Sequence, residues 1–253
     1  MFSGQVLGRL RGAGRGQGQQ RSNAVVDLGR DVHGLILPCP RWEGTFGPGR
    51  ACQDRKMAKA AIHLTGDKDA DALLSRDPLA LLIGMVLDQQ IPMERAFWGP
   101  SELARRMGGP LDAAAIASMD PEKFASLFKE TPALHRFPGS MAGRVQAVCR
   151  IVADEYGGKA DSVWKNPADG KDLIKRLTAL PGIGAQKARI FTALLGKQLG
   201  VQPEGWRAAT KPFGDENTFF SIADITDVES LGKVRAHKQA MKARAKAKRP
   251  AKA

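Results

Sequence analysis

The segment Leu180-Pro181-Gly182-Ile183-Gly184 joins two stretches of helical periodicity through a turn of only a few residues. Its two glycines permit positive φ angles and close approach of another backbone, and the proline restricts how the chain enters the turn. The second helix then begins with amide N–H groups that have no partner within the helix, and the helix dipole makes this end attractive to anions. The segment predicts a hairpin that holds a DNA phosphate through main-chain amides; the alternative is a plain helix–helix turn.

Other segments also have the apolar spacing of helices. Residues 79–87 are apolar nearly all round and follow Asp77-Pro78, which has the form of a capping residue and a first helical proline. The apolar residues of 141–156 recur every three or four positions. A further helix begins at Pro92, and we expect Gly99-Pro100 to interrupt it. Because strand signals are nearly absent, the sequence predicts an all-α fold.

The formal net charge of +13 is distributed unevenly over the 253 residues. Residues 1–56 hold nine Lys or Arg against four Asp or Glu, and residues 231–253 hold nine basic residues and no acid. The first segment also contains 11 of the 28 glycines without any helical or strand period, so we expect a disordered leader or an untranslated extension. We therefore divide the chain into this extension (1–56), a helical body (57–229) and a C-terminal helix with a basic tail (230–253).

Composition excludes several kinds of protein. No run of about 18 apolar residues occurs, which excludes a membrane-spanning helix. Three scattered cysteines cannot form a disulfide framework or a four-thiolate cluster, which indicates a reducing, cytoplasmic location. The four histidines lie far apart along the chain, so we expect no metal site and no cofactor.

From about Asp77 to Glu204 the sequence resembles the helix-hairpin-helix–GPD superfamily of base-excision DNA glycosylases, through the hairpin and the segment Leu87-Asp88-Gln89-Gln90. The resemblance implies a two-domain helical fold that binds double-stranded DNA and extrudes a nucleotide into the cleft between the domains. It implies that Gln90 enters the space left by the nucleotide and that Gln89 supports it; the alternative is a polar pair at a helix end. The expected DNA-binding residues are Pro181, Gly182, Ile183, Gly184, Gln186, Lys187, Gln89 and Gln90.

Two catalytic positions depart from the pattern that the resemblance implies. Members with lyase activity have a lysine two residues beyond the second hairpin glycine, where this chain has Gln186, which cannot form a Schiff base. The family's aspartate lies some twenty residues beyond the hairpin, where Glu204 is the nearest carboxylate; the alternative for Glu204 is a solvated side chain in a turn. Other carboxylates that would replace it on reaching the cleft are Asp88, Asp215 and Glu216.

These observations lead to three competing hypotheses. The first is a monofunctional DNA glycosylase with Glu204 as its catalytic group, and the second is a catalytically inactive DNA-binding module. The third is a helical protein-interaction scaffold, which only the neutral charge of the middle of the chain favours. The iron–sulfur cluster of some relatives is excluded, because Cys149 is the only cysteine beyond residue 57. No protein partner is inferred.

Overall fold

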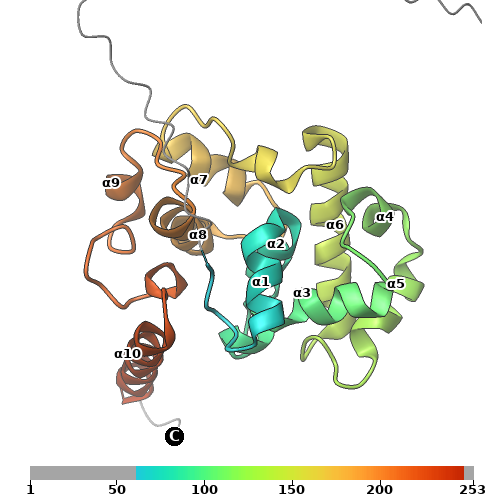
Figure 1. Cartoon of the computed structure of the whole chain (residues 1–253), viewed down its shortest axis with the longest axis horizontal. Helices are drawn as coiled ribbons and strands as arrows, with labels where there is room; N and C mark the ends of the chain where they lie inside the picture. Colours follow the sequence, from blue (N-terminus) through green and yellow to red (C-terminus); the bar gives the residue numbers. More distant parts are fainter. Residues whose placement is uncertain (1–60, 248–253) are drawn as a thin grey trace, which may run out of the picture. The chain divides into compact units, whose positions relative to one another are not determined.

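The computed structural model describes residues 61–247, so the expectations for residues 1–56 and for the end of the basic tail lie outside the described part. This part is built from helices, without a strand among its residues, and the all-α prediction is confirmed (Figure 1). None of its helices is long and apolar enough to cross a membrane. The elements are α1 (Lys68–Arg76), α2 (Pro78–Leu87), α3 (Met93–Met107), α4 (Ala113–Ser118), α5 (Pro121–Lys129), α6 (Pro138–Tyr156), η1 (Ala160–Val163), α7 (Gly170–Thr178), α8 (Ala185–Gln198), α9 (Trp206–Thr210), η2 (Ile222–Asp224) and α10 (Val228–Ala247).

Helix α2 lies at the centre of the fold because its sequence is apolar on every side. The Asp77 carboxylate caps its N-terminus by accepting hydrogen bonds from the amides of Leu79 and Ala80, and Pro78 occupies the first position. All residues of α2 after Pro78 are buried. The helix packs against α3 and α6, and its C-terminal end reaches the turn between α7 and α8.

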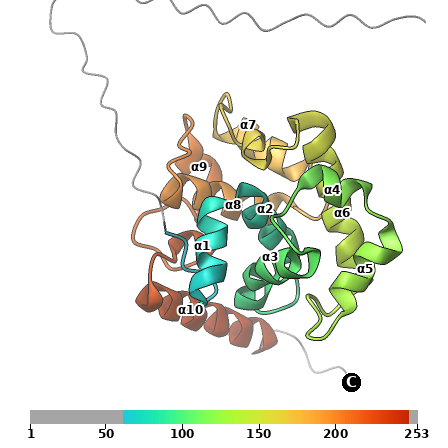
Figure 2. The same ribbon diagram turned by 45° about the vertical axis from the view of Figure 1, so that its right-hand side comes forward.

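The other helices form two groups around α2 (Figure 2). In one group α4 and α5 pack on α6, and in the other α7, α9 and η2 pack on α8. One cluster of buried apolar side chains extends through both groups. The helices thus fall into two groups, but a continuous core joins them, and the described residues form one compact unit rather than two separate domains.

The expected interruption at Gly99-Pro100 is wrong, because α3 continues through both residues. Gly84 of α2 and Gly99 of α3 allow the two helices to approach closely. A Cβ atom on Gly99 would lie 2.8 Å from Leu87 Cδ1. A Cβ atom on Gly84 would lie 2.6 Å from the ring of Phe97. The packing of the two helices thus overrides the local helix-breaking signal of the proline.

Helix α8 carries a buried hydroxyl, Thr192 Oγ1, that has no hydrogen-bond partner among the described residues. A buried polar group without a partner costs about 1–3 kcal/mol, and valine has nearly the same shape as threonine. We expect Thr192→Val to raise the free energy of unfolding by about 1 kcal/mol in urea denaturation. The control Thr192→Ser keeps the hydroxyl, removes a buried methyl and lowers stability. Destabilisation by the valine would show that the hydroxyl has a partner.

Candidate nucleic-acid interface and adjoining cavities

Two buried apolar side chains anchor the turn between α7 and α8 to the core. Leu180 and Ile183 are buried, and the Ile183 amide donates a hydrogen bond to the Leu180 carbonyl over 3.1 Å. Gly182 has a φ of +84°, in the left-handed region that glycine favours. The side chains of Leu180 and Ile183 therefore face the core, and the turn leads into the exposed first residues of α8.

The first amides of α8 are free to bind a ligand. Gly184, Ala185 and Gln186 are exposed, and no described residue accepts a hydrogen bond from their N–H groups. Gly184 forms the N-cap without a side-chain hydrogen bond. These donors lie at the positive end of the helix dipole, which is the geometry that binds a phosphate oxygen.

Hydrogen bonds of the Lys187 side chain link the hairpin to the C-terminal end of α2. Its Nζ donates to the carbonyls of Met85 and Val86 over 2.6 and 3.1 Å, and it lies 3.4 Å from the carbonyl oxygen of Gly182. Burial lowers the pKa of Lys187 to about 8. The ammonium thus binds carbonyls that the end of α2 leaves without helical partners. Its contact with DNA stays a prediction, since this structure turns the ammonium inward.

The two glutamines after α2 occupy different environments. Gln89 Nε2 donates to the carbonyls of Val86 (2.8 Å) and Gly182 (3.4 Å). Its Oε1 accepts a hydrogen bond from Arg144 of α6 over 2.7 Å. Gln90 is exposed and has a left-handed φ of +56°. Gln89 therefore positions the hairpin, and Gln90 is the glutamine that a ligand can reach.

Residues 135–137 lie against the same glutamines. His135 is buried, with its Nε2 2.7 Å from the Gln89 carbonyl oxygen, and its Nδ1 accepts a hydrogen bond from the Phe137 amide. Burial lowers the pKa of His135, so the ring is neutral at pH 7 and carries its proton on Nε2. The Phe137 ring is 46% exposed, with the Arg136 guanidinium 4.8 Å above it. Sequence reasoning missed this segment because it has no motif.

A cavity of about 520 Å³ adjoins the exposed start of α8, since Gln186 is part of its wall. Among the described residues that line it, Asp88 is the only acidic one. We call this space the apolar cavity, because its exposed surface is mainly apolar and half of its lining residues are apolar: Ile190, Pro212, Phe213, Phe220, Ile222 and Met241.

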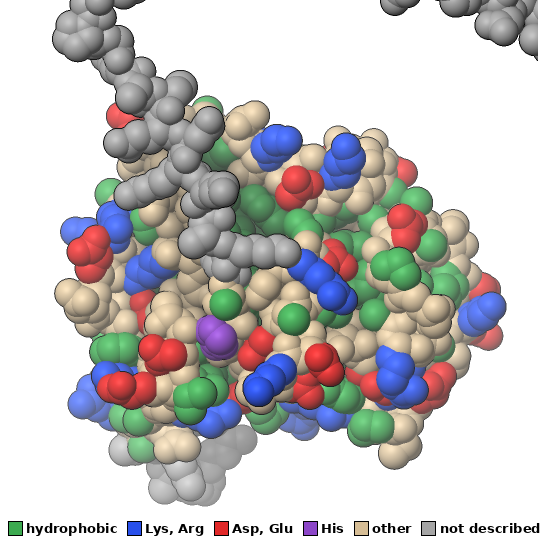
Figure 3. All heavy atoms as spheres, viewed as in Figure 1, with side chains coloured by type: hydrophobic (Ala, Val, Ile, Leu, Met, Phe, Trp, Pro, Cys, Tyr) green, Lys and Arg blue, Asp and Glu red, His purple; other side chains and the backbone are tan. Residues whose placement is uncertain are grey.

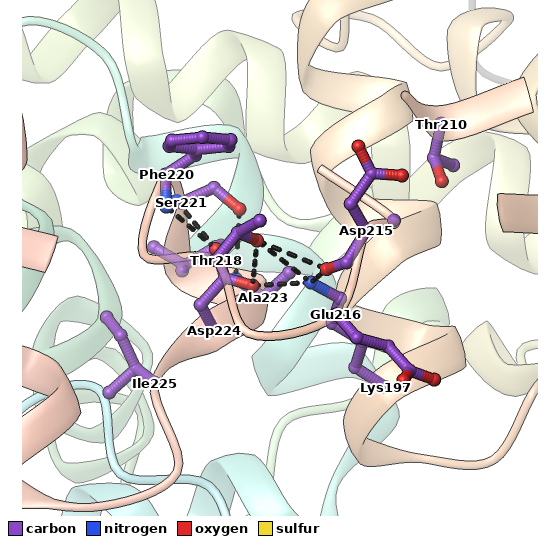
Figure 4. A network of polar contacts seen from close by, with 12 residues as sticks. Lys197, Thr210, Asp215, Glu216, Thr218, Phe220, Ser221, Ala223, Asp224 and Ile225 are labelled. Carbon is purple, nitrogen blue, oxygen red and sulfur yellow. Dashed lines mark hydrogen bonds and ion pairs between the residues drawn. The ribbon is translucent and has the colours of Figure 1, made fainter. Parts of the chain in front are cut away.

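A polar network holds one wall of the apolar cavity against α8 (Figure 4). Lys197 Nζ lies 2.5 Å from Asp224 Oδ1 and donates to the Asp215 carbonyl over 2.6 Å. The other oxygen of Asp224 accepts hydrogen bonds from the amides of Phe220 and Ser221. The buried ion pair therefore fixes the backbone that carries the Phe220 ring.

Asp88 stands at the C-terminal end of α2, where the apolar cavity meets a second cavity. Burial raises the pKa of its carboxyl above the usual range, and Lys238 and Lys187 oppose this rise. A carboxyl with a raised pKa accepts a proton more readily than an ordinary exposed aspartate does, which suits a group that takes a proton from water. In the sequence, Asp88 lies in the segment Leu87-Asp88-Gln89-Gln90, directly after a wholly apolar helix, and it is one of the carboxylates considered in place of Glu204.

The second cavity, of about 680 Å³, shares Asp88 with the first and also includes Gln90. Lys and Arg side chains line it from two sides. We call it the basic groove, and these side chains are Arg136, Arg235, Lys238 and Lys242.

The structure places Glu204 outside both of these spaces. Its carbonyl accepts a hydrogen bond from the amide of Gly170, the first residue of α7, over 2.8 Å. The hairpin follows the opposite end of that helix, about 13 Å away at 1.5 Å per residue. Trp206 holds the turn there, since a Cβ on Gly196 of α8 would lie 2.5 Å from its indole. Glu204 is exposed and lines neither the apolar cavity nor the basic groove, so its catalytic role stays a prediction.

The two other carboxylates considered from the sequence also lie outside the two cavities. Neither Asp215 nor Glu216 lines the apolar cavity or the basic groove. Glu216 forms an exposed ion pair with Arg207 over 2.9 Å. Of the four candidate carboxylates, the structure brings only Asp88 next to the start of α8.

Comparison with known proteins identifies the family of the chain. Residues 83–252, more than half of the chain, match the sequence profile of the family described as HhH-GPD superfamily base excision DNA repair protein. The matched range includes Asp88, the hairpin and α10. No curated protein matches the chain.

Proposed function

The chain belongs to the HhH-GPD superfamily of base excision DNA repair proteins, and we propose that it is a monofunctional DNA glycosylase acting on double-stranded DNA. The observation that supports this proposal most is the position of Asp88. Its carboxyl lies on the wall of an apolar cavity that also includes the exposed start of α8. A helix N-terminus suited to binding phosphate and a half-buried carboxyl are thereby adjacent, as cleavage of an extruded nucleotide requires.

In this proposal the amides of Gly184, Ala185 and Gln186 bind a phosphate of one strand. The damaged base leaves the duplex and enters the apolar cavity, where the ring of Phe220 offers a stacking face. The exposed side chain of Gln90 occupies the gap in the duplex. The energy of unstacking, a few kcal/mol, is smallest for a damaged or mismatched base, which favours such substrates.

Asp88 supplies the chemistry of the proposed reaction. The bond between C1′ and the base nitrogen breaks, and the base keeps the electron pair and takes up a proton from the solvent, to which Asp88 later returns the proton that it accepts from water. The Asp88 carboxylate stabilises the positive charge that develops on the sugar and accepts a proton from the attacking water, whose oxygen bonds to C1′. We infer no lyase step, since Gln186 cannot form a Schiff base and the Lys187 ammonium is engaged by carbonyls of α2.

Base excision from a panel of duplexes with damaged or mismatched bases tests the proposal. The expected result is an abasic product whose strand breaks only after alkali treatment, because alkali cleaves the abasic sites that a monofunctional enzyme leaves intact. Breaks without alkali would contradict the absence of a lyase step. Duplex binding without excision on the whole panel would favour the catalytically inactive module.

A further inference from the structure

Helix α10 carries a net positive charge, whereas the helical body before it is nearly neutral. It contains six Lys or Arg residues and one Glu. In residues 57–230 the basic and acidic residues nearly cancel. On the face shown in Figure 3, Lys and Arg side chains are interspersed with Asp and Glu. The positive charge of the described part is therefore a local property of α10.

Packing explains only the first half of this helix. Leu231 and Val234 are buried against the core, as their spacing in the sequence indicates. Met241 does not continue this contact, because its side chain is 51% exposed. Figure 2 shows α10 extending along one edge of the molecule. Beyond Arg235 the contacts are few: the His237 ring lies 5.0 Å from the Phe220 ring, and Lys238 Nζ lies 3.4 Å from Met93 Sδ. These contacts do not account for the excess of basic residues in this half.

The second half of α10 borders both cavities of the site. Lys238 and Lys242 line the apolar cavity and the basic groove, and Arg136 lines the same groove from the segment after α5. None of these three side chains has an ion-pair partner among the described residues. Arg235 differs, since it pairs with Glu94 over 2.6 Å. Three cations without an ion-pair partner among the described residues therefore line the groove that also includes Asp88.

We propose that α10 is a second DNA-binding element, in which Lys238 and Lys242, with Arg136 across the groove, bind phosphates on either side of the extruded nucleotide. This inference rests on the proposed function, because the nucleotide is assigned to the adjoining apolar cavity. A phosphodiester backbone matches the groove, since it brings several negative charges at regular spacing to cations that form no ion pair among the described residues. The hairpin and α10 then hold the DNA backbone from two sides of Asp88.

The salt dependence of duplex binding tests this inference. Each phosphate contact that is lost makes the plot of log affinity against log salt shallower by about 0.9. We expect Lys238→Gln/Lys242→Gln to reduce the slope by about 1.8 on an undamaged duplex, measured by fluorescence anisotropy from 0.05 to 0.2 M salt. Over this range the wild type then loses about tenfold more affinity than the variant loses. The control Lys159→Gln/Lys171→Gln removes two exposed lysines away from both cavities and leaves the slope unchanged.

The outcomes separate this inference from the glycosylase proposal, because binding to an undamaged duplex needs no excision. A shallower slope in the α10 variant supports the inference even if no duplex in the panel loses a base. A wild-type slope in that variant overturns it even if excision is observed, and so does an equal effect of the control pair. Circular dichroism of both variants verifies that the helices are retained.

Discussion

Replacing Asp88 by asparagine is expected to reduce base excision by 10²- to 10⁴-fold, the usual contribution of a group that transfers a proton. The amide keeps the size of the side chain and its place at the end of α2. It neither accepts a proton from water nor carries the negative charge that faces the developing cation. Single-turnover excision rates at saturating enzyme measure the effect, since they exclude changes in binding and product release.

The same substitution is expected to stabilise the protein at neutral pH. Burial raises the pKa of Asp88 in the folded protein, so the folded state holds this proton more tightly than the unfolded chain does. The stability contributed by the protonated form is present below the unfolded pKa and is lost as the pH rises through the folded pKa. Asparagine stays neutral throughout, so its Tm exceeds that of the wild type at pH 7.5 and approaches it in acid. A lower Tm at pH 7.5 would contradict the raised pKa.

Glu204→Gln provides the matched comparison, because it makes the same carboxylate-to-amide change at the position indicated by counting along the sequence. Glu204 is exposed at the far end of α7, so we expect its excision rate to stay within twofold of the wild type. The opposite pattern, with activity lost in Glu204→Gln and retained in Asp88→Asn, would refute Asp88 and restore the assignment made from the sequence.

Ala185→Pro is expected to weaken duplex binding by about 10- to 100-fold. Proline removes one of the three exposed amide donors, and a hydrogen bond to a charged group contributes about 1.5–3 kcal/mol. The substitution suits the backbone because Ala185 is the first residue of α8, where proline is favoured. The preceding Gly184 has φ −79° and ψ 171°, the extended conformation that a residue before proline adopts. The Kd for an undamaged duplex, measured at fixed salt, gives the effect.

Ala185→Val is the control for this experiment. Valine adds comparable bulk at the same exposed position but retains the amide N–H, so we expect a Kd within about threefold of the wild type. Equal weakening by proline and valine would attribute the loss to bulk and contradict phosphate binding by the amides. Thermal denaturation of both variants shows whether the fold is retained.

The hairpin and the helices were predictable from the sequence because their signals are local. The glycines of the turn, the Asp77-Pro78 cap and the apolar period of α6 involve residues within a few positions of one another. Gly99-Pro100 shows where local reasoning fails, since the contact of α2 with α3 outweighs the preference of the proline. The contacts of Gln89 and Lys187 with the hairpin and with α2 could not be predicted from neighbouring residues either. Their hydrogen bonds to Gly182 and Met85 join residues 93 and 102 positions apart.

The assignment of the catalytic carboxylate shows most clearly what the sequence determines and what only the tertiary structure determines. By itself the sequence determined a helical protein with a hairpin whose amides face outward, because backbone geometry follows from neighbouring residue types. Only the tertiary structure decided that Asp88 and not Glu204 meets the start of α8. The packing of Trp206 on Gly196 holds Glu204 at the other end of α7, and the burial of α2 brings Asp88 to the cavity. Such contacts depend on how distant segments pack together, which spacing along the chain does not encode.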